Sequence, residues 1–239
     1  MSRTPLTEFT PHSNCPYLLG VYLAINAIPD AHLYVDGPDC SFFKAQFIYG
    51  KHDLASTLLD CAGNHRVRFS WVDVNGIVED RSESMAEELR IMEADDKVAA
   101  VLLASMPMAT ITGVQYDTIV RGMDPPYRKP FFEVPGHSLT GDWLDGYGAT
   151  LEALAAGIDL EGGHPADNKV AIVGYFMDRT ERDHLANVEE LERLLGGLGL
   201  DVVSVWPSAR AYSHLQQVRD AALIISLPHG RQAARTLAE

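Results

Sequence analysis

The order of segments along this chain predicts an α/β fold in which parallel sheets are flanked by helices. Strand-like and helix-like segments alternate along much of the sequence, as they do when crossover helices join parallel strands. Residues 98–103 form a continuous apolar run, which is typical of a strand buried on both faces. Residues 184–198 have apolar side chains at helical spacing, and the following Gly199 favours a helix end.

The first part of the chain predicts helices and strands in turn. Residues 16–28 are mostly apolar and predict a buried helix. Residues 66–74 alternate polar and apolar side chains, which predicts a strand. In chain order, helices are expected at 16–28, 41–49, 83–93, 115–121 and 143–156, and strands at 32–35, 66–74, 98–103 and 130–134.

The second part of the chain follows a segment rich in glycine, proline and acidic residues, 159–168, which predicts a boundary. We therefore expect one α/β domain over residues 1–160 and a second over residues 161–239. Beyond the boundary, strands are expected at 170–176, 201–206 and 222–227, and helices at 184–198, 213–220 and from 231 onward. Three strands make a thin sheet, so we expect either that other parts complete it or that the chain is a fragment.

Composition excludes several classes of protein. The chain has 239 residues, 46% of them hydrophobic, which is enough for a substantial core. Its net charge of −14 argues against nucleic acid as a partner and suits docking to a basic protein. No apolar run reaches the roughly 20 residues of a membrane span, and the N-terminus lacks the apolar segment of a signal peptide. Three cysteines do not suit a disulfide framework, so we expect a cytoplasmic protein.

All three cysteines, Cys15, Cys40 and Cys61, lie in the first quarter of the chain. Thiolates are the preferred ligands of iron–sulfur clusters and frequent ligands of zinc. Cys15 precedes Pro16, a residue that favours the first helical turn, and Cys40 follows a turn after a predicted strand. The unpaired N–H groups and positive dipole end of a helix start favour anionic sulfur. Alternatively, each cysteine is a small apolar core residue.

Other candidate residues lie in turns. Asp36 and Asp39 precede Cys40, and either is an oxygen ligand or simply a turn former. His137 follows a predicted strand, and ligands of open parallel sheets bind at the carboxyl ends of strands. The alternative for His137 is an ordinary surface loop. The sequence contains no glycine-rich dinucleotide motif, no phosphate-binding loop and no paired His/Cys zinc spacing.

Several short motifs occur in an order that can be compared with known families. They are the pair Cys15 and Cys40, the turn 35–40 (VDGPDC), the segment 54–57 (LAST), the strand and turn within 98–117, and the loop 132–138 followed by Gly141, Gly146 and Tyr147. Their order resembles nitrogenase component 1 and its relatives, which include the subunits of light-independent protochlorophyllide reductase. The likeness spans nearly the whole chain, although residues 170–239 match in pattern only.

The resemblance implies tandem Rossmann-like domains, without the third such domain that family members usually carry. It also implies that Cys15 and Cys40 correspond to the first two cluster cysteines of the family. Asp36 stands where the family has histidine, and Asp39 stands where it has glycine. Met106 stands in the place of the third cysteine, and a thioether is a poor ligand for iron compared with a thiolate.

From this resemblance we expect a nitrogenase-like oxidoreductase subunit with an iron–sulfur cluster, of the [4Fe–4S] type. Cys15, Cys40 and Cys61 would hold it, with Asp36, Asp39 or a partner subunit as the fourth ligand. His137 is a further cofactor-binding candidate. An ATP-dependent iron–sulfur reductase would supply single electrons for an unidentified substrate. The subunit would assemble with a second copy or with a related chain.

Two alternatives remain open at this point. The chain could be a non-catalytic cluster carrier, scaffold or degenerate paralogue, which Met106 and the short length favour. It could also be a metal-free α/β domain that binds a small molecule at strand ends near His137 and Gly174, with ordinary core cysteines.

Overall fold

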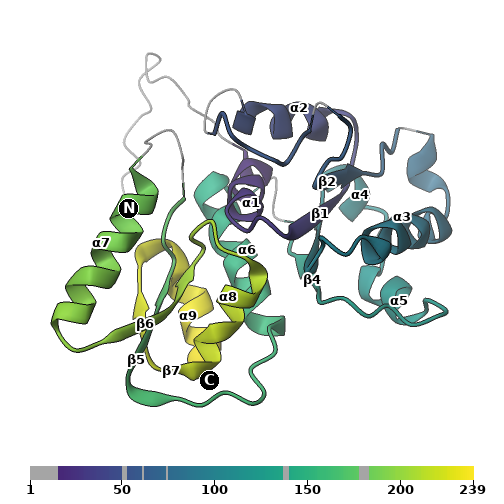
Figure 1. Ribbon diagram of the computed structural model, residues 1–239. Coiled ribbons are helices and arrows are strands. Elements are labelled where there is room, and N and C mark those ends of the chain that lie inside the picture. The colour runs from purple at the N-terminus through teal and green to yellow at the C-terminus, as the bar shows by residue number, and fades with distance from the viewer. Residues whose placement is uncertain (1–15, 50–52, 61, 74, 137–139, 178–182) are drawn as a thin grey trace, which may run out of the picture.

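The structure is a computed structural model that describes residues 16–49, 53–60, 62–73, 75–136, 140–177 and 183–239. Within these ranges the chain forms two parallel sheets (Figure 1). The first has the strand order β2-β1-β3-β4, and the second has the order β6-β5-β7. The predicted α/β fold with parallel sheets and flanking helices is therefore confirmed.

The first sheet consists of β1 (Ala31–Asp36), β2 (Val67–Phe69), β3 (Ala100–Ser105) and β4 (Phe131–Val134). Every residue of β1 and β3 is buried, which explains their continuous apolar sequences. The two strands pair from Ala31 opposite Ala100 to Asp36 opposite Ser105. Their carboxyl ends therefore lie side by side.

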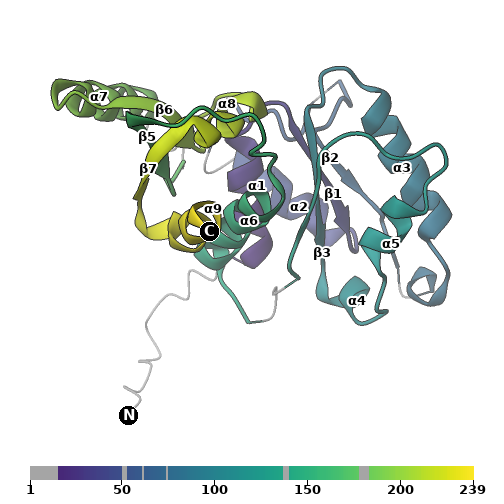
Figure 2. The same ribbon diagram turned by 90° about the horizontal axis from the view of Figure 1, so that it is seen from below.

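Helices cover both faces of this sheet (Figure 2). One face packs against α1 (Tyr17–Asn26), α2 (Cys40–Phe47) and α6 (Trp143–Gly157), and the other packs against α3 (Ser82–Ala94) and α5 (Tyr116–Arg121). Alternate residues of β1 pack on opposite faces of the sheet. Leu33 and Val35 pack against the helices of the first face, and Tyr34 packs against those of the second.

The second sheet consists of β5 (Ala166–Val173), β6 (Asp201–Trp206) and β7 (Ala221–Ser226). One face packs against α7 (His184–Gly197), and the other packs against α6 and α9 (Arg231–Ala238). The short helices α4 (Pro107–Thr110) and α8 (Tyr212–Gln216) follow β3 and β6 respectively.

Helix α6 lies between the two sheets (Figure 2) and packs against α1 on one side and α9 on the other. The crossing with α1 is very close. A Cβ atom added at Gly20 would lie 1.7 Å from the Trp143 carbonyl oxygen, and one at Gly146 would lie 2.0 Å from that of Tyr17. Glycine at both positions therefore lets the two backbones touch and joins the two sheets through one continuous core.

Three segments differ from the sequence-based expectation. The strand expected at 66–74 ends at Phe69, because Trp71 takes a backbone φ of 52°, which leaves the extended conformation. The strand expected at 170–176 spans Ala166–Val173 instead, and Gly174 ends it with a φ of 97°. The turn expected after β3 contains the helical turn α4.

The division into domains 1–160 and 161–239 stays a prediction. The two sheets lie on either side of the predicted boundary, but β5 begins inside it and the core around α6 is shared. Among the helices that the structure describes, none is long and apolar enough to cross a membrane.

Candidate functional site

The carboxyl ends of β1, β3 and β4 meet at one edge of the first sheet. The Met106 backbone N–H donates to the Asp36 carbonyl oxygen at 2.8 Å, which joins the turns after β3 and β1. A Cβ atom added at Gly136 would lie 2.7 Å from Ser105 Oγ, so the chain beyond β4 crosses directly over the end of β3. This edge is where open α/β sheets carry their ligands.

The turn after β1 is shaped by its contact with Met106. A Cβ atom added at Gly37 would lie 2.4 Å from Met106 Cγ, so the thioether side chain can pack there only against glycine. The Gly37 backbone N–H donates to Ser70 Oγ at 2.9 Å, which ties the same turn to the end of β2. The backbone that leads from β1 into α2 is therefore fixed from two sides.

Two sulfur atoms lie around one ammonium group at this edge. Cys40 is exposed and is the first residue of α2, and Lys44 follows it by one helical turn. Lys44 Nζ lies 4.0 Å from Cys40 Sγ and 4.0 Å from Met106 Sδ. A positive charge thus stands beside the Cys40 sulfur. Asp39 is also exposed, and in this part of the chain its side chain makes no hydrogen bond that caps α2.

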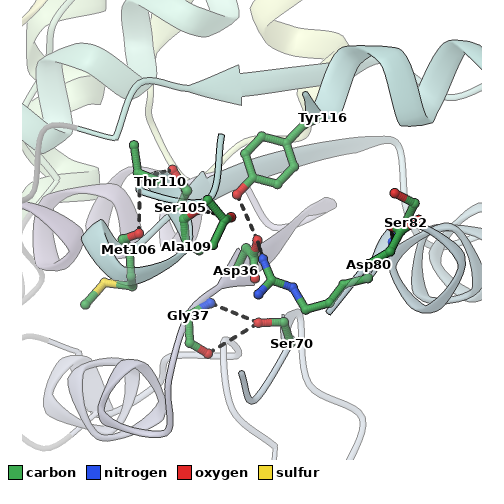
Figure 3. Close-up of polar contacts among 12 residues, drawn as sticks. Asp36, Gly37, Ser70, Asp80, Ser82, Ser105, Met106, Ala109, Thr110 and Tyr116 are labelled. Carbon is green, nitrogen blue, oxygen red and sulfur yellow. Dashed lines mark hydrogen bonds and ion pairs between the residues drawn. The ribbon is translucent and has the colours of Figure 1, made fainter. Parts of the chain in front are cut away.

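Asp36 lies beside this turn but faces other partners. Its Oδ2 atom accepts hydrogen bonds from Arg81 Nη2 and from the Tyr116 hydroxyl, each at 2.8 Å. Figure 3 shows the Asp36 carboxylate against the Tyr116 hydroxyl, with the Met106 thioether extending away from them. Burial, the charge of Asp36 and this hydrogen bond raise the pKa of Tyr116 far above its ordinary value. Tyr116 is therefore a hydrogen-bond donor here and not a base.

The structure brings together only some of the residues that the sequence predicted as ligands. Asp36, Asp39 and Cys40 share one turn, whereas Cys15, Cys61 and His137 lie outside the described residues. The Tyr17 hydroxyl donates to the Pro135 carbonyl oxygen at 2.7 Å, so the start of α1 and the loop beyond β4 are joined. In the part of the chain that the structure describes, no three His, Cys, Asp or Glu side chains are grouped to hold a metal ion.

Three residues of this edge were not predicted. Arg81 and Tyr116 come from segments far from Asp36 in the sequence, and no local pattern indicated their meeting. The position of Lys44 could have been predicted, because a lysine four residues after a cysteine at a helix start lies on the same helix face.

An exposed aromatic cluster borders Cys40. Phe43 and Trp71 are 63% and 55% exposed, which is unusual for such large apolar side chains. The Phe42 ring joins them, with centroids 6.0 Å from Phe43 and 5.7 Å from Trp71. Contiguous exposed apolar surface of this kind is typical of a protein–protein contact.

The other expected ligand position, the strand end near Gly174, is closely packed. A Cβ atom added at Gly174 would lie 2.2 Å from the Gly230 backbone nitrogen, so the two backbones abut. The rings of Phe176 and His229 lie beside them, with centroids 5.1 Å apart. The immediate surroundings of Gly174 are thus filled by protein.

Comparison with known proteins identifies the family of this chain. The sequence matches the family described as nitrogenase component 1 type oxidoreductases over residues 15–239. No curated protein matches the chain. Among solved structures, "Nitrogenase Cp1 at pH 6.5" is similar with a TM-score of 0.73 and 13% identity, over 99% of this chain and 54% of that one. "Nitrogenase Cp1 at pH 5" is similar with a TM-score of 0.71 and 14% identity, over 100% of this chain and 47% of that one.

The chain thus spans about half the length of the nitrogenase chains that it resembles. The TM-scores establish a shared fold, and at 13% and 14% identity these structures establish the fold alone. The family match covers nearly the whole sequence. The chain belongs to the nitrogenase component 1 type oxidoreductase family.

Proposed function

We propose that this chain is a nitrogenase-like oxidoreductase subunit that holds an iron–sulfur cluster, of the [4Fe–4S] type, beside the start of α2. The observation that carries the proposal is the position of Cys40. Its exposed thiol stands at a helix start, with the Lys44 ammonium 4.0 Å away, at the sheet edge that carries ligands in such folds. Membership of the family supports the same reaction class.

The described side chains at this edge supply only part of the ligands that a cluster needs. Of the described residues at this edge, Cys40 offers a thiolate, and Met106 offers a thioether, which binds iron weakly. The proposal therefore requires Cys15, with Cys61 or a partner subunit supplying a further thiolate. Asp36 is engaged by Arg81 and Tyr116, so the exposed Asp39 is the better candidate for a fourth ligand. His137 stays a candidate for contact with the cofactor.

The residues around Cys40 would set the properties of such a centre. When bound, an iron–sulfur cluster accepts and releases one electron at a time. Lys44 places a positive charge beside the sulfur ligands, which favours the more negative, reduced state. The buried Met106 thioether lies 4.0 Å from the same ammonium group, so the lysine charge is shared between the two sulfur atoms.

Two partners follow from the surface around Cys40. The exposed Phe43 and Trp71 suit a second copy of the chain or a related subunit, which would cover Cys40 and complete its ligands. The net charge of −14 suits an ATP-dependent iron–sulfur reductase with a basic docking face. We propose a cytoplasmic location for this assembly, since three cysteines do not suit the disulfide framework of a secreted protein.

Anaerobic reconstitution with iron and sulfide tests the proposal. We expect a brown protein with equal amounts of iron and sulfide and a paramagnetic signal after reduction. Cys40→Ala should lose most of the iron, whereas Ser41→Ala, one residue away, should retain it. A colourless wild-type protein without iron would end the proposal.

A non-catalytic role is the second candidate, and Met106 favours it because it weakens the donor set. The chain would then be a cluster carrier, a scaffold or a degenerate paralogue. A scaffold predicts that Cys40→Ala leaves both assembly and cellular phenotype unchanged. A catalytic subunit predicts intact assembly without activity.

A further inference from the structure

A cleft of about 1110 Å³ lies at the amino edge of the first sheet, at the opposite end of the strands from Cys40. His32 lines it from the start of β1, Arg66 from the position directly before β2, and Lys97 from the segment before β3. Gln46 lines it from the second half of α2. Small-molecule sites typically have volumes of roughly 300–1,000 Å³, so this cleft has room for such a ligand. The proposed cluster does not use this space.

His32 is a buried polar side chain in the wall of this cleft. It is only 9% exposed, and no described residue forms a hydrogen bond with its imidazole ring. Neither ring nitrogen is fully enclosed, so a molecule in the cleft can reach them. Burial, and next the charge of Arg66, lower the pKa of His32 to about 4. Near neutral pH the ring therefore offers one N–H donor and one nitrogen acceptor to a ligand.

Three further rings, those of Phe42, Tyr49 and His65, line the same cleft. Tyr49 is 54% exposed, and the ring centroids of Phe42 and His65 lie 6.4 Å apart. The Asp60 backbone N–H donates to His65 Nδ1 at 2.8 Å, which fixes the position of that ring. Aromatic side chains pair with aromatic rings in offset or edge-to-face contacts, beyond the gain from buried area. The wall therefore favours an aromatic guest over an aliphatic one.

The charges of the described wall balance one another. Arg66 and Lys97 are matched by the carboxylates of Asp60 and Asp95. Arg66 is also engaged within the protein, since its Nη1 donates to the Ala31 carbonyl oxygen at 2.7 Å. A charged ligand would lose its hydration here without a matching attraction, so the wall favours an uncharged ligand.

We infer that this cleft binds a small uncharged aromatic molecule whose polar substituent forms a hydrogen bond with His32. The ligand ring packs against Phe42, Tyr49 and His65. Water can also satisfy His32, but it leaves the aromatic wall in contact with solvent, so the ring of the ligand supplies the gain in binding. This inference is independent of the cluster and of its electron transfer.

Titration of the ¹⁵N-labelled protein with phenol, followed by NMR, tests the inference. We expect saturable shifts of the backbone amides of His32, Gln46 and His65. The dissociation constant should be about 1–10 mM, as is usual for a ligand of this size. Shifts that do not saturate, or that leave these three amides unaffected, would overturn the inference.

Three probes of similar size test the separate parts of the inference. Cyclohexanol keeps the hydroxyl group but lacks the aromatic ring, and it should bind at least about threefold more weakly than phenol. Toluene keeps the ring but forms no hydrogen bond with His32, and it should bind at least about fivefold more weakly. Benzoate keeps the ring but carries a charge, and it should also bind more weakly than phenol. Binding of any of these probes as tightly as phenol would contradict the inference.

Two exposed aromatic residues provide a matched pair of variants. Tyr49→Ala removes an exposed ring of the cleft wall and should weaken phenol binding at least about threefold in a folded protein. Phe43→Ala removes a ring that is 63% exposed and is not among the described residues of the cleft wall, so it should leave phenol binding unchanged. Undiminished binding to Tyr49→Ala would place the ligand elsewhere and contradict the inference.

A change at His32 tests its hydrogen bond with the ligand. His32→Leu replaces the imidazole with an apolar side chain and should abolish the preference for phenol over toluene. A folded variant that still prefers phenol as strongly as the wild type would contradict the assigned role of His32.

Discussion

The two sheets of this protein differ in how tightly their surroundings constrain them. In the first sheet, β1 and β3 are buried at every residue, and α1 touches α6 backbone to backbone. In the second, β7 has exposed positions such as Leu223, which is 53% exposed, and α7 has glycines with open space around them. The polar network around Asp36 belongs to the first sheet. The tightly packed sheet therefore positions the candidate site, and changes there should cost far more than matched changes in the second sheet.

The largest expected contrast is between two glycine-to-alanine changes. Gly20→Ala would place Cβ 1.7 Å from the Trp143 carbonyl oxygen, so α1 and α6 must separate. We expect the free energy of unfolding to fall by about 3 kcal/mol or more. Gly196→Ala in α7 places the new Cβ where no atom lies within 4 Å. This change should raise the free energy of unfolding by about 0.5–1 kcal/mol, because alanine favours a helix more than glycine does. Urea denaturation measures both, and similar effects would contradict the contrast.

The next contrast is between two ion pairs. Asp36→Ala leaves Arg81 without its partner in a pair whose side chains are 17% and 3% exposed. We expect a loss of about 3–5 kcal/mol in the free energy of unfolding. Glu190→Ala breaks the pair with Arg193 on α7, where the side chains are 52% and 68% exposed, and should leave the free energy of unfolding almost unchanged because solvent screens the pair. Equal losses would mean that Asp36 is not held as the structure indicates.

Acid should destabilise the first sheet through His32. Burial, and next the charge of Arg66, lower the pKa of His32 to about 4. The unfolded chain takes up this proton near pH 6.5 and the folded chain only near pH 4, so stability falls as pH drops through that window. The loss should approach about 3 kcal/mol. His32→Gln should make the midpoint of urea unfolding depend less on pH between pH 7 and pH 4.5. If the midpoint of the variant fell with pH as steeply as that of the wild type, His32 would not be the cause.

The smallest expected effect concerns Lys44 in the reconstituted protein. Lys44→Met removes the positive charge 4.0 Å from Cys40 Sγ and should lower the midpoint potential of a cluster there. We expect a shift of roughly 20–60 mV, because solvent screens a partly exposed pair. Lys44→Arg keeps the charge and serves as the control in a redox titration followed by electron paramagnetic resonance. A potential that does not respond to Lys44→Met would place the cluster away from α2.

Local sequence patterns were sufficient for most of the fold. The apolar run at 98–103 marks a strand that is buried on both faces, and helical spacing marks α3 and α7. The end of β2 was missed because Trp71 adopts a conformation that its side chain does not favour. Strand ends set by backbone strain or by a neighbouring turn leave little trace in hydrophobic periodicity.

The candidate site was predictable only where its residues are neighbours in the chain. Cys40 and Asp39 follow a strand directly, so their place at the sheet edge follows from topology. Arg81 and Tyr116 reach Asp36 from the segments at α3 and α5, and only the folded layers bring them together.

The location of iron in crystals of the anaerobically reconstituted protein tests the central proposal most directly. An anomalous difference map recorded at the iron absorption edge would locate any bound iron without reference to activity. We predict a strong peak within bonding distance of Cys40 Sγ, on the α2 face of the first sheet. Iron bound only at other surface groups, with the Cys40 sulfur free of it, would contradict a cluster at this site.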